Sequence, residues 1–108
     1  MITTHVLDTA RGTPAANLGV LLERRHGSDW LAVGRGVTDA NGRVTAFSSA
    51  SVEPGTYRLT FDTGAYHRAA GFTPFFPEVT VVFEVATPVH HHVPLLLSPY
   101  GYSTYRGT

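Results

Sequence analysis

The sequence predicts an all-β fold, a two-sheet antiparallel β-sandwich of about eight short strands with one short helix. Three observations lead to this prediction. Short segments alternate apolar and polar residues with the period of two that is typical of half-buried strands. Turn-forming residues separate these segments at nearly regular spacing. The chain has 108 residues, which is the usual size of a single domain, so we expect one domain over residues 1–108.

The first half of the chain contains four of the expected strands. Gly34 and Gly36 interrupt the third strand and favour a bulge or a close approach of another backbone segment. Asp39-Ala40-Asn41-Gly42 predicts a tight turn, because Asn and Gly tolerate positive φ angles. Loops or turns are expected at residues 11–14 and 26–29. The four strands are expected at residues 2–8, 18–24, 30–37 and 43–47.

The second half begins with a turn at Glu53-Pro54-Gly55 and contains the expected helix. Residues 65–70 lie between two glycines and include three alanines, a composition that favours a short helix. Pro94 falls within a predicted strand, and since proline has no N–H to donate, we expect it on an edge strand or at a bulge. The strands of this half are expected at residues 56–61, 79–85, 89–97 and 100–106.

The composition excludes several classes of protein. Eight arginines and no lysines balance eight acidic residues, and no basic stripe is visible, so we do not expect a nucleic-acid partner. No apolar run approaches the ~20 residues needed to span a bilayer, so no membrane partner is expected. The chain lacks cysteine, which excludes disulfides and a thiolate nucleophile. With no secretory signal pattern at Met1, the cytoplasm is the expected compartment.

A cluster of three histidines, His90-His91-His92, is the first candidate site. In a strand, His90 and His92 share one face while His91 points to the other. Lone strand histidines usually have structural roles, but two chemical interpretations are open here. The same-face pair holds zinc if a third ligand converges on it. Alternatively, one imidazole is a general base, because imidazole titrates near neutral pH.

Other candidate groups lie far from this cluster in the sequence. His5 is in the first predicted strand, and Arg43 follows the Asn41-Gly42 turn. The chain ends in Ser103-Thr104-Tyr105-Arg106-Gly107-Thr108, which combines a phenol, a guanidinium and a hydroxyl next to the terminal carboxylate. Spacing alone does not bring these four segments together.

Four segments resemble the transthyretin-related proteins, in order and over essentially the whole chain. The last of them is the most specific and resembles the 5-hydroxyisourate hydrolase branch of that family. Because this branch, unlike the hormone carriers, has a His, Arg, His and terminal Tyr-Arg-Gly-Ser pattern, the resemblance implies an enzyme. The matching segments are Thr4–Ala15, Thr38–Arg43, Phe75–Val79 and His92–Thr108.

The resemblance also implies which residues form the site. It implies that the site requires no metal or cofactor. His91 lies outside the set, and Thr108 replaces the family's terminal serine while keeping a hydroxyl and a carboxylate. The family further implies a transthyretin-like sandwich and a homotetramer, a dimer of dimers with sites in the channel between dimers. The implied catalytic residues are His5, Arg43 and His92, and the implied substrate-binding residues are His5, Arg43, Tyr105, Arg106, Gly107 and Thr108.

The implied reaction is hydrolytic opening of 5-hydroxyisourate to 2-oxo-4-hydroxy-4-carboxy-5-ureidoimidazoline, in the degradation of urate. Such a reaction needs a base for water, stabilisation of an oxyanion and an acid for the leaving nitrogen. His5 and His92 are expected to share the proton transfers, with the base left undecided between them. Arg43 is expected to bind the carbonyl edge of the substrate. The alternatives are a transthyretin-like carrier of a small aromatic ligand, a zinc-binding sandwich and an accessory domain.

Overall fold

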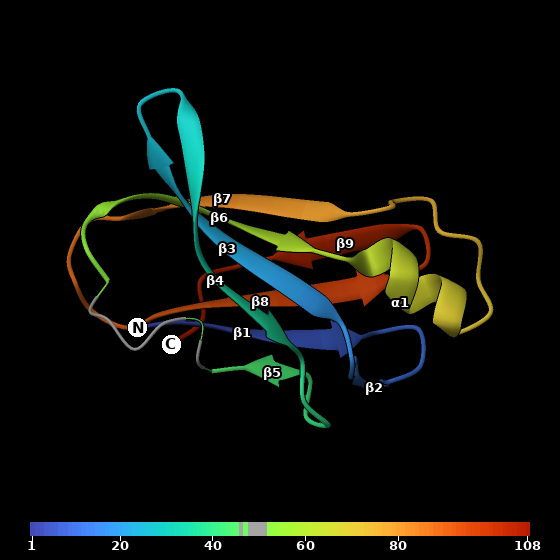
Figure 1. The fold of residues 1–108 in the computed structure, drawn as a ribbon. Coiled ribbons are helices and arrows are strands. Elements are labelled where there is room, and N and C mark those ends of the chain that lie inside the picture. The colour runs from blue at the N-terminus through green and yellow to red at the C-terminus, as the bar shows by residue number, and fades with distance from the viewer. Residues whose placement is uncertain (46, 48–51) are drawn as a thin grey trace.

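The computed structural model describes residues 1–45, 47 and 52–108, and it confirms a sandwich of two facing sheets with one short helix (Figure 1). The first sheet has the strand order β2-β1-β8-β9, and β5 also pairs with β1. Its strands are β1 (Ile2–Asp8), β2 (Thr13–Pro14), β5 (Arg43–Val44), β8 (His91–Ser98) and β9 (Gly101–Thr104). The second sheet has the order β4-β3-β6-β7. Its strands are β3 (Gly19–His26), β4 (Asp29–Val37), β6 (Gly55–Phe61) and β7 (Val79–Val85).

Alternation along β1 and β8 separates a buried face of the first sheet from an outward one. Val6 and Leu95 lie side by side in the β1–β8 pair and are fully buried against the second sheet. Burying an aliphatic side chain of this kind stabilises a fold by roughly 1.5–3 kcal/mol. Because successive side chains point to opposite faces, His5 and His92 are on the outward face. The buried apolar side chains of the core are Ile2, Val6, Ala15, Leu18, Val20, Leu22, Val44, Phe47, Tyr57, Leu59, Phe61, Val79, Val85, Val93, Leu95 and Leu97.

One strand pair departs from the antiparallel pairing of this sandwich. β1 and β8 run parallel over seven residue pairs, from Ile2 beside His91 to Asp8 beside Leu97. Parallel pairing needs a long connection between the strands. Here most of the chain, including the whole second sheet, lies between them in sequence. A local pattern of alternation does not record the direction of a strand's distant partner.

Pro94 also differs from the prediction, because β8 is an inner strand between β1 and β9. The β8–β9 ladder ends at the pair Leu95 and Thr104, and an isolated bridge joins His92 to Gly107 further along. Pro94 lies in the gap between these pairings, where its missing N–H interrupts the ladder. Thr104 instead donates its hydroxyl to the Pro94 carbonyl at 2.7 Å. The terminal tail therefore leaves regular strand structure after Thr104, earlier than the predicted end at residue 106.

Most other element bounds agree with the prediction to within a few residues. The predicted loop at 11–14 contains the two-residue strand β2, and β5 is shorter than the predicted strand 43–47, of which residue 46 lies outside the described residues. The predicted strand 89–97 begins instead at His91. A register irregularity between β3 and β4, opposite Gly34, matches the expected bulge.

The helix α1 (Thr63–Ala69) connects β6 to β7 and is fixed to the first sheet. Asp62 caps its first turn by accepting a hydrogen bond from the Ala65 N–H. The Tyr66 hydroxyl donates to the buried carboxylate of Asp8 at 2.7 Å. Burial, followed by the bond to Asp8, raises the pKa of Tyr66 to about 12, so the phenol keeps the proton that it donates. The helix thus holds the end of β1 in place.

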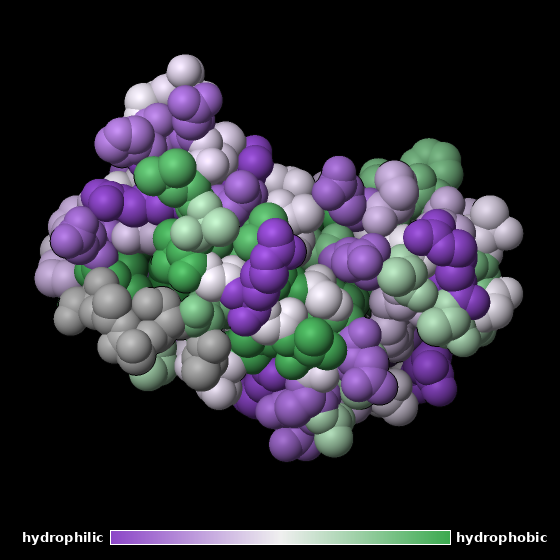
Figure 2. Space-filling model, viewed as in Figure 1, coloured by the Kyte–Doolittle hydropathy of each residue, from purple (hydrophilic) through white to green (hydrophobic). Residues whose placement is uncertain are grey.

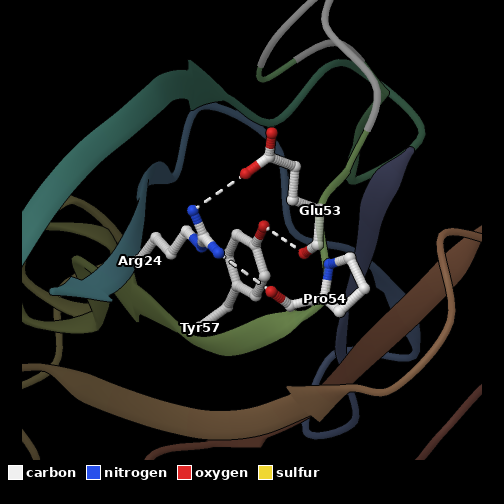
Figure 3. A network of polar contacts seen from close by, with 4 residues as sticks. All are labelled: Arg24, Glu53, Pro54 and Tyr57. Carbon is white, nitrogen blue, oxygen red and sulfur yellow. Dashed lines mark hydrogen bonds and ion pairs between the residues drawn. The ribbon is translucent and has the colours of Figure 1, made fainter.

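A second group of polar contacts fixes the segment that leads into β6 (Figure 3). Arg24 on β3 forms an ion pair with Glu53 at 3.1 Å and donates to the Pro54 carbonyl at 2.9 Å. The hydroxyl of Tyr57 donates to the Glu53 carbonyl at 2.6 Å. These contacts hold the predicted turn at residues 53–55 against the second sheet.

The outward face of the second sheet mixes polar and apolar side chains (Figure 2). Trp30 lies there, within cation–π distance of Arg25 and Arg58. The hairpin tip between β3 and β4 projects from the body and is largely hydrophilic in Figure 2. No helix among the described residues is long and apolar enough to cross a membrane.

Candidate active site

The outward face of the first sheet brings together the side chains that lie far apart in the sequence. In the antiparallel β1–β5 pair, His5 lies opposite Arg43. In the parallel β1–β8 pair, His92 lies beside Thr3, two residues before His5 on the same face of β1. Since neighbouring strands are about 4.8 Å apart, His5, Arg43 and His92 occupy adjacent places on one surface. β1 is the central strand of this arrangement.

Arg43 reaches this position because the preceding turn is tightly constrained. The Asp39 carboxylate accepts hydrogen bonds from the N–H groups of Asn41 and Arg43. Gly42 has φ +76°, and the Val6 N–H donates to its carbonyl at 2.7 Å. A Cβ at Gly42 would collide with the Val6 carbonyl oxygen, so only glycine lets β5 approach β1 this closely.

The turn carboxylate, Asp39, is a charged neighbour that the sequence analysis did not assign to the site. The backbone hydrogen bond from Arg43 is the largest of the causes that lower the pKa of Asp39. The charges of Arg43 and His5 also lower it, which places this carboxylate within electrostatic range of both side chains. The turn that positions Arg43 therefore also supplies the nearby negative charge.

The surroundings of His92 lower its pKa. Burial of its half-buried ring is the largest of the causes that lower the pKa of His92 below its ordinary value of 6.5. The charges of Arg43, His90 and His5 lower this pKa further. At neutral pH the ring is therefore uncharged, with a lone pair available for a proton.

The terminal tail packs directly against this ring. The Gly107 N–H donates to the His92 carbonyl at 2.8 Å, and the two residues form an isolated bridge. A Cβ at Gly107 would lie 2.5 Å from Cδ2 of His92, so the ring occupies the space that a side chain would need. Tyr105 and Arg106 are exposed, and both line a hollow of about 240 Å³ together with His92. Thr108 follows Gly107 and is exposed.

His91 and His90 have different surroundings from each other. His91 is buried on the opposite face of β8, as the alternation of side chains predicts. Its Nδ1 lies 2.7 Å from the Val89 carbonyl oxygen. His90 is exposed, and its Nε2 lies 2.7 Å from Oγ1 of Thr3. The same Thr3 oxygen lies 2.8 Å from Nδ1 of His92. Sequence reasoning did not single out Thr3, because its place between the two histidines depends on the β1–β8 register.

The zinc interpretation of the histidine pair lacks a third ligand in the described part of the chain. No group of three or more His, Cys, Asp or Glu side chains there could hold a metal ion. His90 and His92 both direct a ring nitrogen to Thr3 rather than to a common point between them.

Size does not identify the site. The larger of the two hollows described, about 500 Å³, lies on the outward face of the second sheet, and its lining contains none of the predicted site residues. Its charged lining residues are Arg35, Asp62 and Glu78, and no histidine is among the lining residues. The convergence of His5, Arg43 and His92 is the better guide, because it includes His92, whose pKa is lowered, and perturbed titratable groups mark functional sites.

A transthyretin-type sandwich whose outward face carries two histidines, an arginine and an ordered tail defines the class of this protein. The model of the HIUase/Transthyretin family matches residues 2–107, and the chain belongs to this family. It is 46% identical to a 5-hydroxyisourate hydrolase of Caulobacter vibrioides, over 99% of this chain and 97% of that protein. It is 43% identical to the enzyme of the same name from Salmonella dublin, over 100% of this chain and 81% of that protein.

Two solved structures show how closely the backbone follows the family. The Klebsiella pneumoniae 5-hydroxyisourate hydrolase superposes with a TM-score of 0.89 at 38% identity, covering 99% of this chain and 97% of that one. Sea bream transthyretin in complex with thyroxine superposes with a TM-score of 0.91 at 34% identity, covering 99% of this chain and 94% of that one. An enzyme and a ligand-binding protein thus share this backbone, so the side chains of the site must decide between the two activities.

Proposed function

We propose that this chain hydrolyses 5-hydroxyisourate to 2-oxo-4-hydroxy-4-carboxy-5-ureidoimidazoline, as a step in urate degradation. The observation that carries the proposal is the meeting of His5, Arg43 and His92 on one face, in a chain whose relatives carry the name of this hydrolase. Residues 1–108 would form a single hydrolase domain. The proposed place of action is the cytoplasm.

In the proposed mechanism, His92 is the general base. Its lowered pKa keeps the ring neutral near pH 7, and its Nε2 has no hydrogen-bond partner among the described residues. His92 takes a proton from water as the water oxygen attacks a ring acyl carbon of the substrate. The bond between that carbon and a ring nitrogen then breaks, and His5 is placed to give the leaving nitrogen a proton.

Arg43 and the tail supply binding and charge stabilisation in this proposal. Arg43 is exposed and always protonated, and its planar guanidinium suits the carbonyl edge of the substrate and the developing oxyanion. Tyr105 orients the flat ring, and Arg106, Gly107 and Thr108 shape the pocket. No organic cofactor or metal is assigned a role.

The site lies on an open face in a single chain, which supports the further proposal of a homotetramer built as a dimer of dimers. Tyr105 is 55% exposed, so a substrate on this face would have water on one side. A second copy facing the same surface would form a closed channel. β7 and β9 are the terminal strands of their sheets. Residues of both strands line one hollow, so the open edges of the two strands lie on the same side of the sandwich (Figure 1). Such edges readily pair with another copy.

The experiment that tests the function generates 5-hydroxyisourate from urate in situ and follows the decay of its ultraviolet absorbance. We expect the protein to accelerate this decay, and His92→Ala or His5→Ala to lower turnover by roughly 10²–10⁴-fold, the usual contribution of general acid–base catalysis. Light scattering during chromatography measures the oligomer. If the protein is a folded tetramer and the hydroxyisourate absorbance decays no faster in its presence, the proposed enzymatic function is rejected.

A transthyretin-like carrier is the second candidate, because the chain superposes closely on a thyroxine-bound transthyretin. The same preparation distinguishes the two functions. Saturable binding of a small aromatic ligand, measured by calorimetry, without acceleration of hydroxyisourate decay would favour the carrier.

A further inference from the structure

The hydroxyl of Thr3 connects two imidazoles that differ in exposure. Its Oγ1 lies 2.8 Å from Nδ1 of His92 and 2.7 Å from Nε2 of His90. Thr3 is buried, His92 is half-buried and His90 is exposed, so the three groups lead from the site to solvent. Their alignment depends on the parallel register that sets Thr3 beside His92, and on the His91 N–H donating to the Met1 carbonyl at 2.9 Å.

The Thr3 hydroxyl has one proton to donate but contacts two ring nitrogens. This restricts which ring nitrogens of the two neutral histidines carry a proton. A hydroxyl donates one hydrogen bond and accepts others. If Thr3 donates to His90, then His92 must donate from Nδ1, and its Nε2 is an unprotonated base. If Thr3 donates to His92, then His90 must donate from Nε2, and Nε2 of His92 carries the proton. The direction of the hydroxyl is therefore linked to the tautomer of His92.

We propose that Thr3 and His90 are positioning residues that set the tautomer of His92 and carry its Nδ1 proton to solvent. This inference rests on the proposed hydrolysis. When His92 takes a proton from water at Nε2, its Nδ1 proton moves to Oγ1 of Thr3. The hydroxyl proton of Thr3 moves at the same time to Nε2 of His90, and the exposed His90 releases its Nδ1 proton to water. The reverse shift, with release of the Nε2 proton to water, restores the starting tautomer of His92 after His5 has protonated the leaving nitrogen.

The charges around His92 favour movement of the proton outward. A protonated His92 would be close to the guanidinium of Arg43, whereas the exposed His90 ring is in contact with water. Moving the positive charge to His90 removes it from the part of the site that must bind and polarise the substrate. The titratable or charged groups that face His92 or line the hollow beside it are His5, Arg43, Glu84, His90, His91, Tyr105 and Arg106.

Variants of Thr3 separate the hydroxyl from the shape of the side chain. Thr3→Val keeps the branched shape and removes the hydroxyl, whereas Thr3→Ser keeps the hydroxyl. We expect Thr3→Val to lower kcat by about 10–100-fold, the loss known for outer partners of functional histidines at metal sites, with little change in KM. Thr3→Ser is expected to restore most of this loss. The exposed Thr73→Val is the matched control, with unchanged turnover expected.

His90→Gln tests whether His90 carries a proton or only holds the hydroxyl. Glutamine offers hydrogen-bonding groups in place of the imidazole but does not titrate. We expect kcat to fall, with the acid limb of its pH profile moved to higher pH, because removing the charge of His90 raises the pKa of His92. His26→Gln at the exposed hairpin tip is the control. A profile for His90→Gln that superimposes on that of the parent overturns the relay, and so does Thr3→Val turnover equal to that of Thr3→Ser.

A measurement without substrate keeps this inference separate from the proposed function. Nitrogen-15 NMR of the imidazoles reports which ring nitrogen of His92 carries the proton. We expect Thr3→Val, but not Thr3→Ser, to change the tautomer ratio of His92 in a folded protein. If the parent does not hydrolyse the substrate but Thr3→Val changes the ratio, the hydrolysis fails and the coupling stands. An unchanged ratio rejects the coupling whatever the activity.

Discussion

Gly107 is the residue whose replacement should most selectively damage the proposed site. A Cβ added there would lie 2.5 Å from Cδ2 of His92 and 3.2 Å from its Cγ. Ordinary carbon–carbon contacts are about 3.5–4.0 Å, so the ring and the tail must separate by about 1 Å in Gly107→Ala. A misplacement of about 1 Å can lower a rate by about 100-fold. We therefore expect kcat to fall about 100-fold, through movement of His92 or of the tail.

The same substitution should leave the core intact, because Gly107 lies in the tail beyond β9 and outside the buried cluster. Turnover is measured by the decay of hydroxyisourate absorbance, and stability by thermal unfolding of the same preparation. Gly101→Ala on β9 is the matched control, since its added Cβ would meet Oγ of Ser98 at an ordinary 3.6 Å. Full turnover in Gly107→Ala would refute the claim that the tail fixes the ring of His92.

Three further predictions concern the fold and the pH dependence. Tyr66→Phe removes the hydrogen bond to the buried Asp8 and should lower the free energy of unfolding by about 1–3 kcal/mol in a denaturant titration, with turnover unchanged. Gly42→Ala should lower stability by at least about 1 kcal/mol, because its φ of +76° and the adjacent backbone oppose a side chain, and should lower turnover by displacing Arg43. Turnover should persist as pH falls to 6.5 and decline only below it, because the pKa of His92 is lowered.

The pH prediction has a counterpart in stability whose sign follows from the same shift. The unfolded chain binds a proton at His92 near pH 6.5, whereas the folded protein binds it only at lower pH. The unfolded state thus takes up more protons in this window, and the contribution of His92 to stability is lost as the pH falls from 6.5 through the folded pKa. A stability curve for His92→Gln that falls with acid as steeply as the parent's would contradict this assignment.

Local sequence patterns predicted which side chains share a face, because the period of two is a property of each strand by itself. That rule separated His91 from His92, as their burial shows. The Asn41-Gly42 pair separately predicted the turn that places Arg43, because these residues tolerate the positive φ that Gly42 adopts. The family resemblance then connected segments that the spacing of residues could not.

What the patterns could not supply is which strands become neighbours and in which register. The contact of Thr3 with both histidines exists only because β1 runs parallel to β8 with Thr3 beside His92. Trp30 is a second residue whose surroundings the patterns could not supply. Its aromatic surface is covered by Arg25 and Arg58, which come from strands on either side of it in the chain, and no apolar pattern records such stacking.

The division of β1 and β8 into two faces explains how one backbone can serve different chemistries. Val6 and Leu95 are completely buried between the sheets, so substitutions there leave cavities that cost stability. His5 and His92 alternate with them on the outward face and contribute little to the core. Exchanging the outward residues should therefore change the ligand and the reaction with only small effects on folding. We expect double variants of His5 and His92 to unfold at the same temperature as the parent and to have no turnover. A large loss of stability in such variants would mean that the site and the core are coupled, and that this face is not free to change its chemistry.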